Sequence, residues 1–137
     1  MEPISPPRKG NPWGPEATPY LAIGGELAVR RLIETFYDRI DAESPILRAM
    51  LPRDDSGSRQ KLFEYFSGWL GGPDLYVEKR GHPRLRMRHF PFSIGAEEAA
   101  EWMRCMRIAM DETGLSGELQ AYLDTRLATL ADHMQNR

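Results

Sequence analysis

Apolar residues recur at intervals of three and four along most of this chain, and this spacing restricts it to a helical fold. The clearest case begins at Glu26 and continues for about 16 residues. Its apolar positions, which share one face of the predicted helix, are Val29, Leu32, Ile33, Phe36, Tyr37 and Ile40. We therefore expect an all-α protein whose core forms where such faces meet.

Three further long helices are predicted by the same spacing. One follows possible N-caps at residues 54–58, carries an apolar side and ends at residues 71–73, which read Gly-Gly-Pro. Another runs from about Gly95 to Thr113, and the last begins after Ser116. Their expected inward positions include Leu62, Tyr65, Phe66 and Trp69, then Ala99, Trp102, Met103, Met106, Ala109 and Met110, then Leu119, Tyr122, Leu123, Leu127, Leu130 and Met134.

The intervening segments are short. A turn is expected at residues 20–23, and a helical piece starting at Pro45 should stop before Pro52 because a proline disfavours the α conformation of its predecessor. Residues 73–84 are predicted to form a loop. Residues 85–90 are predicted to form a short helix, since a lone strand would have no pairing partner.

Composition excludes several classes of protein. The 137 residues suit one domain, and Cys105, the single cysteine, excludes an intrachain disulfide and a thiolate metal cluster. A net charge of −2 argues against nucleic-acid binding. No apolar run approaches the roughly 20 residues of a membrane span, and the N-terminus lacks an apolar signal core. We expect a soluble, cytoplasmic protein that contacts neither nucleic acid nor membrane.

The N-terminal segment differs from the rest. Six of the eleven prolines fall within residues 1–19. Proline fixes φ and removes an amide donor, so this segment is predicted to be an extended arm, with the folded domain covering residues 20–137. Trp13 is the residue able to pin the arm to that domain.

Three sets of residues are candidates for chemistry. His89, between apolar neighbours, could ligate a haem iron, although composition and spacing alone favour a histidine hydrogen-bonded at a helix end. Tyr37 and Trp102 each end a large ring in a hydrogen-bond donor, suited either to a small polar ligand or to a backbone carbonyl. A basic cluster could pair with the two propionates of haem or could be a solvated surface; it comprises Lys79, Arg80, Arg84, Arg86 and Arg88.

Three stretches of the chain together resemble a known family, the group II (O type) truncated haemoglobins. The first is the run from Gly71-Gly72-Pro73 through Tyr76 to residues 80–92, which read RGHPRLRMRHFPF. The second is residues 102–106, WMRCM, and the third is the Phe36-Tyr37 pair. The resemblance covers about residues 20–134, and the histidine-containing run is its most specific part.

The resemblance implies a two-over-two helical sandwich around haem b, iron protoporphyrin IX. His89 would be the proximal ligand, Tyr37 and Trp102 the distal donors to bound O₂, and Ser58 the distal gate. Arg86 or Arg88 would hold the propionates. The remaining haem-pocket residues would be Phe36, Leu51, Leu62, Tyr65, Phe66, Phe92 and Met106.

One position departs from the family pattern. Group II members carry Tyr, Phe or His just before the proline that corresponds to Pro52, whereas this chain has Leu51. Leucine has no donor, so a ligand in the pocket would lose one hydrogen bond, worth roughly 0.5–1.5 kcal/mol. Tyr37 and Trp102 would then carry the stabilisation of the ligand.

Three functions follow from these residues. The first is reversible binding of O₂ and other diatomic gases. The second is haem-dependent peroxidase or nitric-oxide dioxygenase activity, which would require an external reductase because the chain has no flavin or nicotinamide domain. The third is a haem-free helical module that holds a partner through its basic cluster. The sequence leaves the oligomeric state open.

Overall fold

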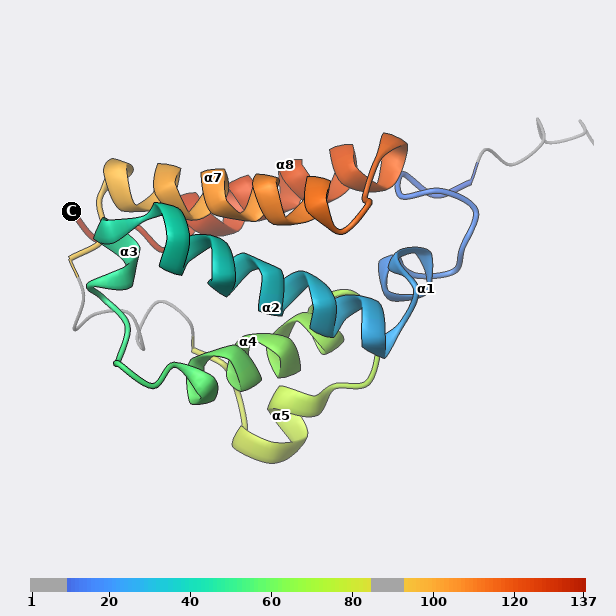
Figure 1. Ribbon diagram of the computed structural model, residues 1–137. Helices are drawn as coiled ribbons and strands as arrows, with labels where there is room; N and C mark the ends of the chain where they lie inside the picture. Colours follow the sequence, from blue (N-terminus) through green and yellow to red (C-terminus); the bar gives the residue numbers. More distant parts are fainter. Residues whose placement is uncertain (1–9, 85–92) are drawn as a thin grey trace, which may run out of the picture.

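The structure is a computed structural model that describes residues 10–84 and 93–137 (Figure 1). Within these ranges the chain forms seven helices and no strand, which confirms the predicted all-α class. The helices are α1 (Pro19–Ile23), α2 (Glu26–Glu43), α3 (Pro45–Arg48), α4 (Ser56–Trp69), α5 (Leu75–Arg80), α7 (Ala96–Glu112) and α8 (Gly117–His133).

The long helices form two layers, one of α7 with α8 and one of α2 with α4. In Figure 1, α7 and α8 lie together along one side, while α2 crosses beside them and α4 and α5 lie below it. The most extensive contacts join α2 to α7, α2 to α4, α4 to α5 and α7 to α8. Helix α2 is therefore the central element, packed on one side by α7 and on the other by α4.

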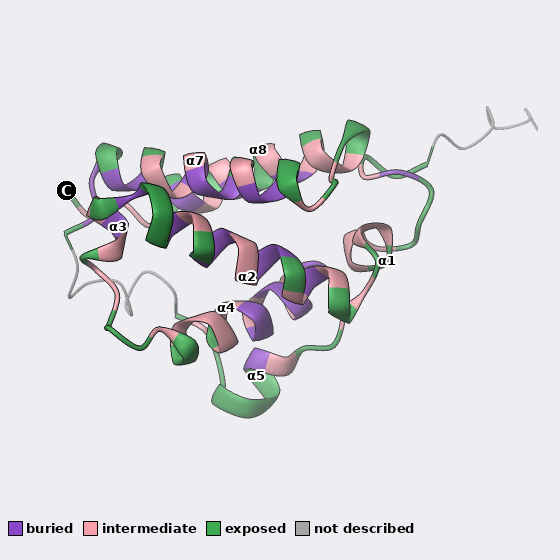
Figure 2. Cartoon of the chain, viewed as in Figure 1, coloured by how far each residue is buried: buried purple, intermediate pink, exposed green. Residues whose placement is uncertain are grey.

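The buried face of α2 is the one its spacing predicts. Its buried residues are Val29, Leu32, Ile33, Phe36, Tyr37 and Ile40. They meet the buried face of α7, which includes Ala99, Met103, Met106, Ala109 and Met110. Figure 2 shows these buried stretches turned toward one another in the interior. Cys105 is also fully buried here, as a small apolar core residue.

Helix α4 differs from its prediction. Phe66 is buried, but Leu62, Tyr65 and Trp69 are only partly buried, and Glu64 and Ser67 are buried instead. The reason is that α4 packs on α2 and on α5 at the same time. Of the partly buried residues, Leu62 and Tyr65 line a cavity, so apolar spacing on this helix marks a pocket wall as well as a core.

Residues 73–84 do not form the predicted loop throughout, because α5 occupies Leu75–Arg80. A helix of six residues is too short to show periodicity, and it buries one residue, Tyr76. Its position is fixed by ion pairs that a linear pattern does not reveal. The carboxylate of Glu64 receives Arg80 Nε at 2.7 Å and Lys79 Nζ at 3.1 Å. The predicted helix at residues 85–90 lies outside the described residues.

Two terminal segments pack against the helices. The Trp13 ring meets Tyr122 of α8 edge-on at 5.1 Å, the kind of contact expected of this residue. At the other end, the main-chain N–H of Asn136 donates to the Ile94 carbonyl oxygen at 2.7 Å. The side-chain oxygen of Asn136 accepts from the main-chain N–H of Ile94 at 2.8 Å. Residues near position 136 are thereby tied to the start of α7.

None of the helices in residues 10–84 and 93–137 combines the length and the apolar character that a membrane span requires.

Candidate functional site

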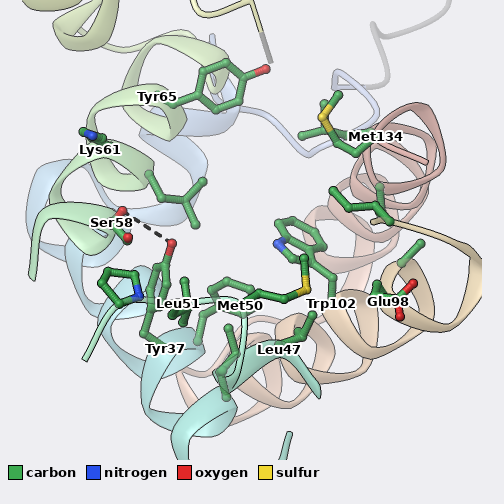
Figure 3. Close-up of a pocket in the computed structure, with 18 of the residues that line it drawn as sticks. Tyr37, Leu47, Met50, Leu51, Ser58, Lys61, Tyr65, Glu98, Trp102 and Met134 are labelled. Carbon is green, nitrogen blue, oxygen red and sulfur yellow. Dashed lines mark hydrogen bonds between the residues drawn. The ribbon is translucent and has the colours of Figure 1, made fainter. Parts of the chain in front are cut away.

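A cavity of about 490 Å³ lies between α2, α3, α4, α7 and the end of α8 (Figure 3). This volume is in the range of pockets that bind small molecules and cofactors. Its wall is mainly apolar. It is lined by Phe36, Tyr37, Ile40, Leu47, Met50, Leu51, Pro52, Ser58, Lys61, Leu62, Tyr65, Tyr76, Ile94, Glu98, Ala99, Trp102, Leu130, Ala131 and Met134.

Tyr37 brings a hydroxyl group to this wall from the middle of α2. The residue is 8% exposed, and its hydroxyl donates to the carbonyl oxygen of Ser58 at a long 3.4 Å. Burial, with the nearby negative charge of Asp55, raises the pKa of the Tyr37 phenol well above its ordinary value. Tyr37 therefore remains a protonated donor at neutral pH, and its present hydrogen bond is weak enough to exchange for another.

Trp102 brings a second donor from α7. Its ring packs edge-on against Phe36, with centroids 5.2 Å apart, and this contact fixes its orientation. In Figure 3 the indole nitrogen points into the cavity, on the side facing Tyr37. No residue in the described part of the chain accepts a hydrogen bond from that nitrogen. The structure thus brings together the two donors that the sequence singled out.

Ser58 and Lys61 lie on the α4 side of the pocket. Ser58 is in the first turn of α4, where its carbonyl oxygen accepts from Tyr37. Lys61 is about one turn further along and exposed, so it places a positive charge on the α4 side of the pocket. Sequence reasoning missed Lys61, because a single exposed lysine on a polar helix face carries no distinguishing pattern.

Leu51 lies in the wall as well, together with Leu47 and Met50 (Figure 3). The short segment that carries it is held by Arg48, which donates to the carbonyl oxygens of Pro52 at 3.1 Å and Arg53 at 3.0 Å. The side of the pocket formed by α3 and this segment is consequently apolar.

The side opposite Leu51 was not predicted as part of a pocket. It consists of Ile94, Glu98 and Ala99 and, from α8 and its end, Leu130, Ala131 and Met134. The carboxylate of Glu98 accepts from the Gly95 amide at 2.6 Å and from Arg137 Nη2 at 2.7 and 2.8 Å. These contacts hold the start of α7 against the end of α8. Leu130 and Met134 carried a helical pattern, but that pattern does not distinguish a cavity wall from a core.

The remaining predicted site residues fall into two groups. Phe66 and Met106 are buried in the core and do not line the cavity. His89, Arg86, Arg88 and Phe92 lie outside the described residues, in the segment between Arg84 and Ser93.

The first two cations of the predicted basic cluster, Lys79 and Arg80, pair with the buried Glu64 and so hold α5 to α4. In the structure these two cations therefore contribute to the packing of α5 on α4.

Comparison with known proteins identifies the class. A family model described as "Bacterial-like globin" matches residues 18–136, so the chain belongs to this family. The globin family implies a haem cofactor and the binding of oxygen and other diatomic gases.

Relatives narrow the class to the group II truncated haemoglobins. The group 2 truncated hemoglobin YjbI of Bacillus subtilis is 45% identical over 119 residues, which cover 87% of this chain and 89% of that protein. The group II truncated hemoglobin of Bacillus anthracis superposes with a TM-score of 0.86 at 41% identity, covering 88% of this chain and 98% of its own. The group II 2-on-2 hemoglobin of Agrobacterium tumefaciens is 46% identical, with a TM-score of 0.83 and coverages of 90% and 97%. These matches confirm the expected two-over-two fold.

The pocket fits haem by the chemistry of its wall. A flat, mostly apolar macrocycle needs an apolar enclosure, and the lining residues provide one with few polar atoms. Within residues 10–84 and 93–137 no cluster of three potential metal ligands occurs. A porphyrin needs only an axial ligand from the protein, so this finding is compatible with haem.

Proposed function

We propose that this protein binds haem b through His89 and uses the cavity to hold O₂, with the Tyr37 hydroxyl and the Trp102 indole N–H as donors to the gas. When bound, haem supplies the iron atom at which diatomic gases bind reversibly. The observation that carries the proposal is the convergence of these two donors, from α2 and α7, on one apolar cavity.

Each donor is suited to this role for a stated reason. Tyr37 is kept protonated by burial, and its 3.4 Å bond to Ser58 is long, so a better acceptor in the cavity can compete for the hydroxyl. Trp102 is half-buried in the cavity wall, and its indole N–H has no acceptor among the described residues, so it is available to donate to a ligand in the cavity.

Two donors should slow the release of O₂. A net contribution of roughly 1 kcal/mol from each hydrogen bond corresponds to about a fivefold change in rate for each. Slow release suits scavenging, sensing or redox chemistry better than bulk delivery. A solved relative from Bacillus subtilis, 44% identical with a TM-score of 0.82, is described as a truncated oxygen-avid haemoglobin.

The residues around the two donors shape the cavity. Ser58, small and weakly polar, leaves the α4 side of the cavity open, and Leu51 withholds a third donor on the α3 side. Phe36, Leu62 and Tyr65 contribute apolar wall. We assign the propionates to Arg86 or Arg88, since Lys79 and Arg80 are engaged by Glu64.

The role of His89 is tested by replacing it. His89→Ala should abolish or greatly weaken haem retention, measured as loss of the Soret band after expression with added haem. His133→Ala is the control, because His133 is exposed on α8 and does not line the cavity. An unchanged spectrum in His89→Ala would refute the assignment.

A second candidate is turnover at the same site, either peroxide reduction or nitric-oxide dioxygenation. It is favoured by two oxidisable rings, Tyr37 and Trp102, in the wall of the cavity. The reaction would draw its electrons from an external reductase. Steady-state consumption of peroxide well above that of free haem would favour this candidate, and consumption equal to free haem would favour binding alone.

A further inference from the structure

Arg59 joins two helices through an unusual concentration of charge. It lies in α4, and its guanidinium contacts four carboxylates: Glu34 at 2.7 Å, Asp38 at 3.0 Å, Asp41 at 3.4 Å and Asp55 at 3.0 Å. We call these five residues the Arg59 cluster. The Arg59 side chain is 16% exposed, so the guanidinium is largely withdrawn from water.

The cluster fixes the first turn of α4 against α2. Three of its acids follow one another on α2 at spacings of four and three, so they form a stripe along one face of that helix. Asp55 is instead the residue that precedes α4, and its main-chain carbonyl oxygen accepts a hydrogen bond from the Arg59 main-chain amide at 3.0 Å. Arg59 therefore clamps the N-terminal end of α4 onto α2.

Tyr37 lies within this arrangement. It is on α2 among the acids of the stripe, and the Arg59 guanidinium carbon is 5.5 Å from the centre of its ring. The acceptor of its hydroxyl is the carbonyl of Ser58, the residue immediately before Arg59. Any shift of the first turn of α4 along α2 would therefore move the acceptor of the Tyr37 hydroxyl.

Charge pairing alone does not account for the cluster. The second carboxylate oxygen of Asp55, Oδ2, is buried and has no hydrogen-bond partner among the described residues. A buried acceptor without a partner costs free energy, so the geometry here is not the one that would pair every atom.

We propose that Arg59 is a positioning residue for Tyr37: by clamping the first turn of α4 to α2, it sets the direction in which the Tyr37 hydroxyl points into the cavity. This inference rests on the proposed role of Tyr37 as a donor to the gas. Arg59 itself lies outside the cavity wall and acts only through Tyr37 and the Ser58 carbonyl.

The test is a double-mutant cycle on the haem-loaded full chain. Arg59→Met keeps an unbranched apolar stem and removes the charged guanidinium group, and Tyr37→Phe removes the hydroxyl. We expect Arg59→Met to raise the dissociation rate of O₂ several-fold in the native background. In the Tyr37→Phe background it should leave the rate unchanged, because the group it positions is gone.

A spectroscopic measurement supplies a second readout. With carbon monoxide as the probe, the C–O stretching band should shift and broaden in Arg59→Met, because the Tyr37 dipole would sample several directions. Arg39→Met is the matched control: Arg39 also joins α2 to another helix, through Glu112 of α7 at 3.3 Å, and it does not line the cavity. Its band and its dissociation rate should match those of the unmodified protein.

The outcomes separate the two proposals. An equal effect of Arg59→Met in both backgrounds would overturn the positioning role, and so would an unchanged rate in the native background. If Tyr37→Phe alone changes nothing, the donor role of Tyr37 fails first. Should Arg59→Met not fold, Arg59→Lys keeps the charge but cannot reach all four acids, and we expect a smaller change of the same sign that again disappears with Tyr37→Phe.

Discussion

Single residues decide which parts of the pocket wall are polar and which are apolar. Tyr37 and Trp102 place donors toward its centre, whereas Leu47, Met50 and Leu51 offer only carbon and sulfur surface. The two donors lie on different walls, from α2 and α7, and the apolar residues of the α3 segment lie beside Tyr37 (Figure 3). Leu51 has no donor where the family pattern has Tyr, Phe or His, so our proposal relies on the Tyr37 hydroxyl and the Trp102 indole N–H.

The residue scale yields a prediction for Tyr37→Phe. Removing the hydroxyl takes away one donor without changing the shape of the ring, at a cost of roughly 0.5–1.5 kcal/mol. We expect O₂ to dissociate about 2- to 12-fold faster, measured by stopped-flow displacement with carbon monoxide. Tyr122→Phe, on α8 against Trp13, should leave the rate unchanged. Equal rates in the two variants would contradict the prediction.

Part of the cavity lining could be predicted from the sequence, because some of its residues carry hydrogen-bond donors that set them apart. Tyr37, Trp102 and Ser58 were identified through donor chemistry and family resemblance, and all three line the cavity. Phe66 and Met106 do not, although they have the same helical spacing as wall residues. The apolar spacing of a helix identifies the residues that face the interior. Whether these residues pack against other side chains or line a cavity depends on the distance to the opposite helix.

At the scale of the helices, the spacing of apolar residues predicted the helices that bury a continuous apolar stripe. It missed α5, which does not bury one. Helix α2 carries six buried residues at helical intervals, and its buried face matches the prediction residue by residue. Helix α5 has a single buried residue and is fixed by Glu64, a residue ten or more positions away in α4. A long-range ion pair leaves no periodic signal in a sequence.

This ion pair predicts a pH dependence. Burial alone would raise the pKa of Glu64, but hydrogen bonds from Arg80, Gln60 and Lys79 outweigh it and lower the pKa from 4.5 to about 2. A lowered pKa means that the folded state favours the charged form. The contribution to stability is therefore complete above pH 4.5 and is lost as the pH falls toward 2.

Glu64→Gln should accordingly lower the free energy of unfolding by about 2 kcal/mol near neutral pH, with the deficit shrinking below pH 4.5. Denaturant titrations at several pH values between neutral and acidic measure the free energy of unfolding of the variant and of the unmodified protein. Glu78→Gln is the control within α5, because Glu78 is exposed, and it should change stability little at any pH. A deficit in Glu64→Gln that stays constant with pH would contradict this account.

Across the whole molecule, contacts between distant parts of the chain complete the pocket. Ile94, at the start of α7, exchanges two hydrogen bonds with Asn136, and Glu98 is bound by Arg137. Gly95 leaves room for this arrangement, since a Cβ there would come within 3.1 Å of the Arg137 guanidinium carbon. The end of α8 and the start of α7 consequently form one continuous wall.

Asn136→Ala tests this closure. The change leaves the Ile94 amide without its acceptor, and an unpaired amide in a partly buried position costs roughly 1–2 kcal/mol. We expect a melting temperature lower by a few degrees and faster haem loss to an apoprotein acceptor. Gln135→Ala is the control, because the Gln135 side chain pairs only locally with Asp132. If both variants lose haem at the same rate, the contact with Ile94 does not contribute to closure.

The pairing of residue 136 with residue 94 also has a consequence in time. A ribosome releases the chain from its N-terminus onward, so α2, α4 and α7 emerge and begin to associate while the far wall is still hidden in the exit tunnel. Only after Leu130, Met134 and Asn136 have emerged can the enclosure around the ligand close. The prosthetic group that the proposed function requires can therefore be fully enclosed only once the segment that follows α8 has been made.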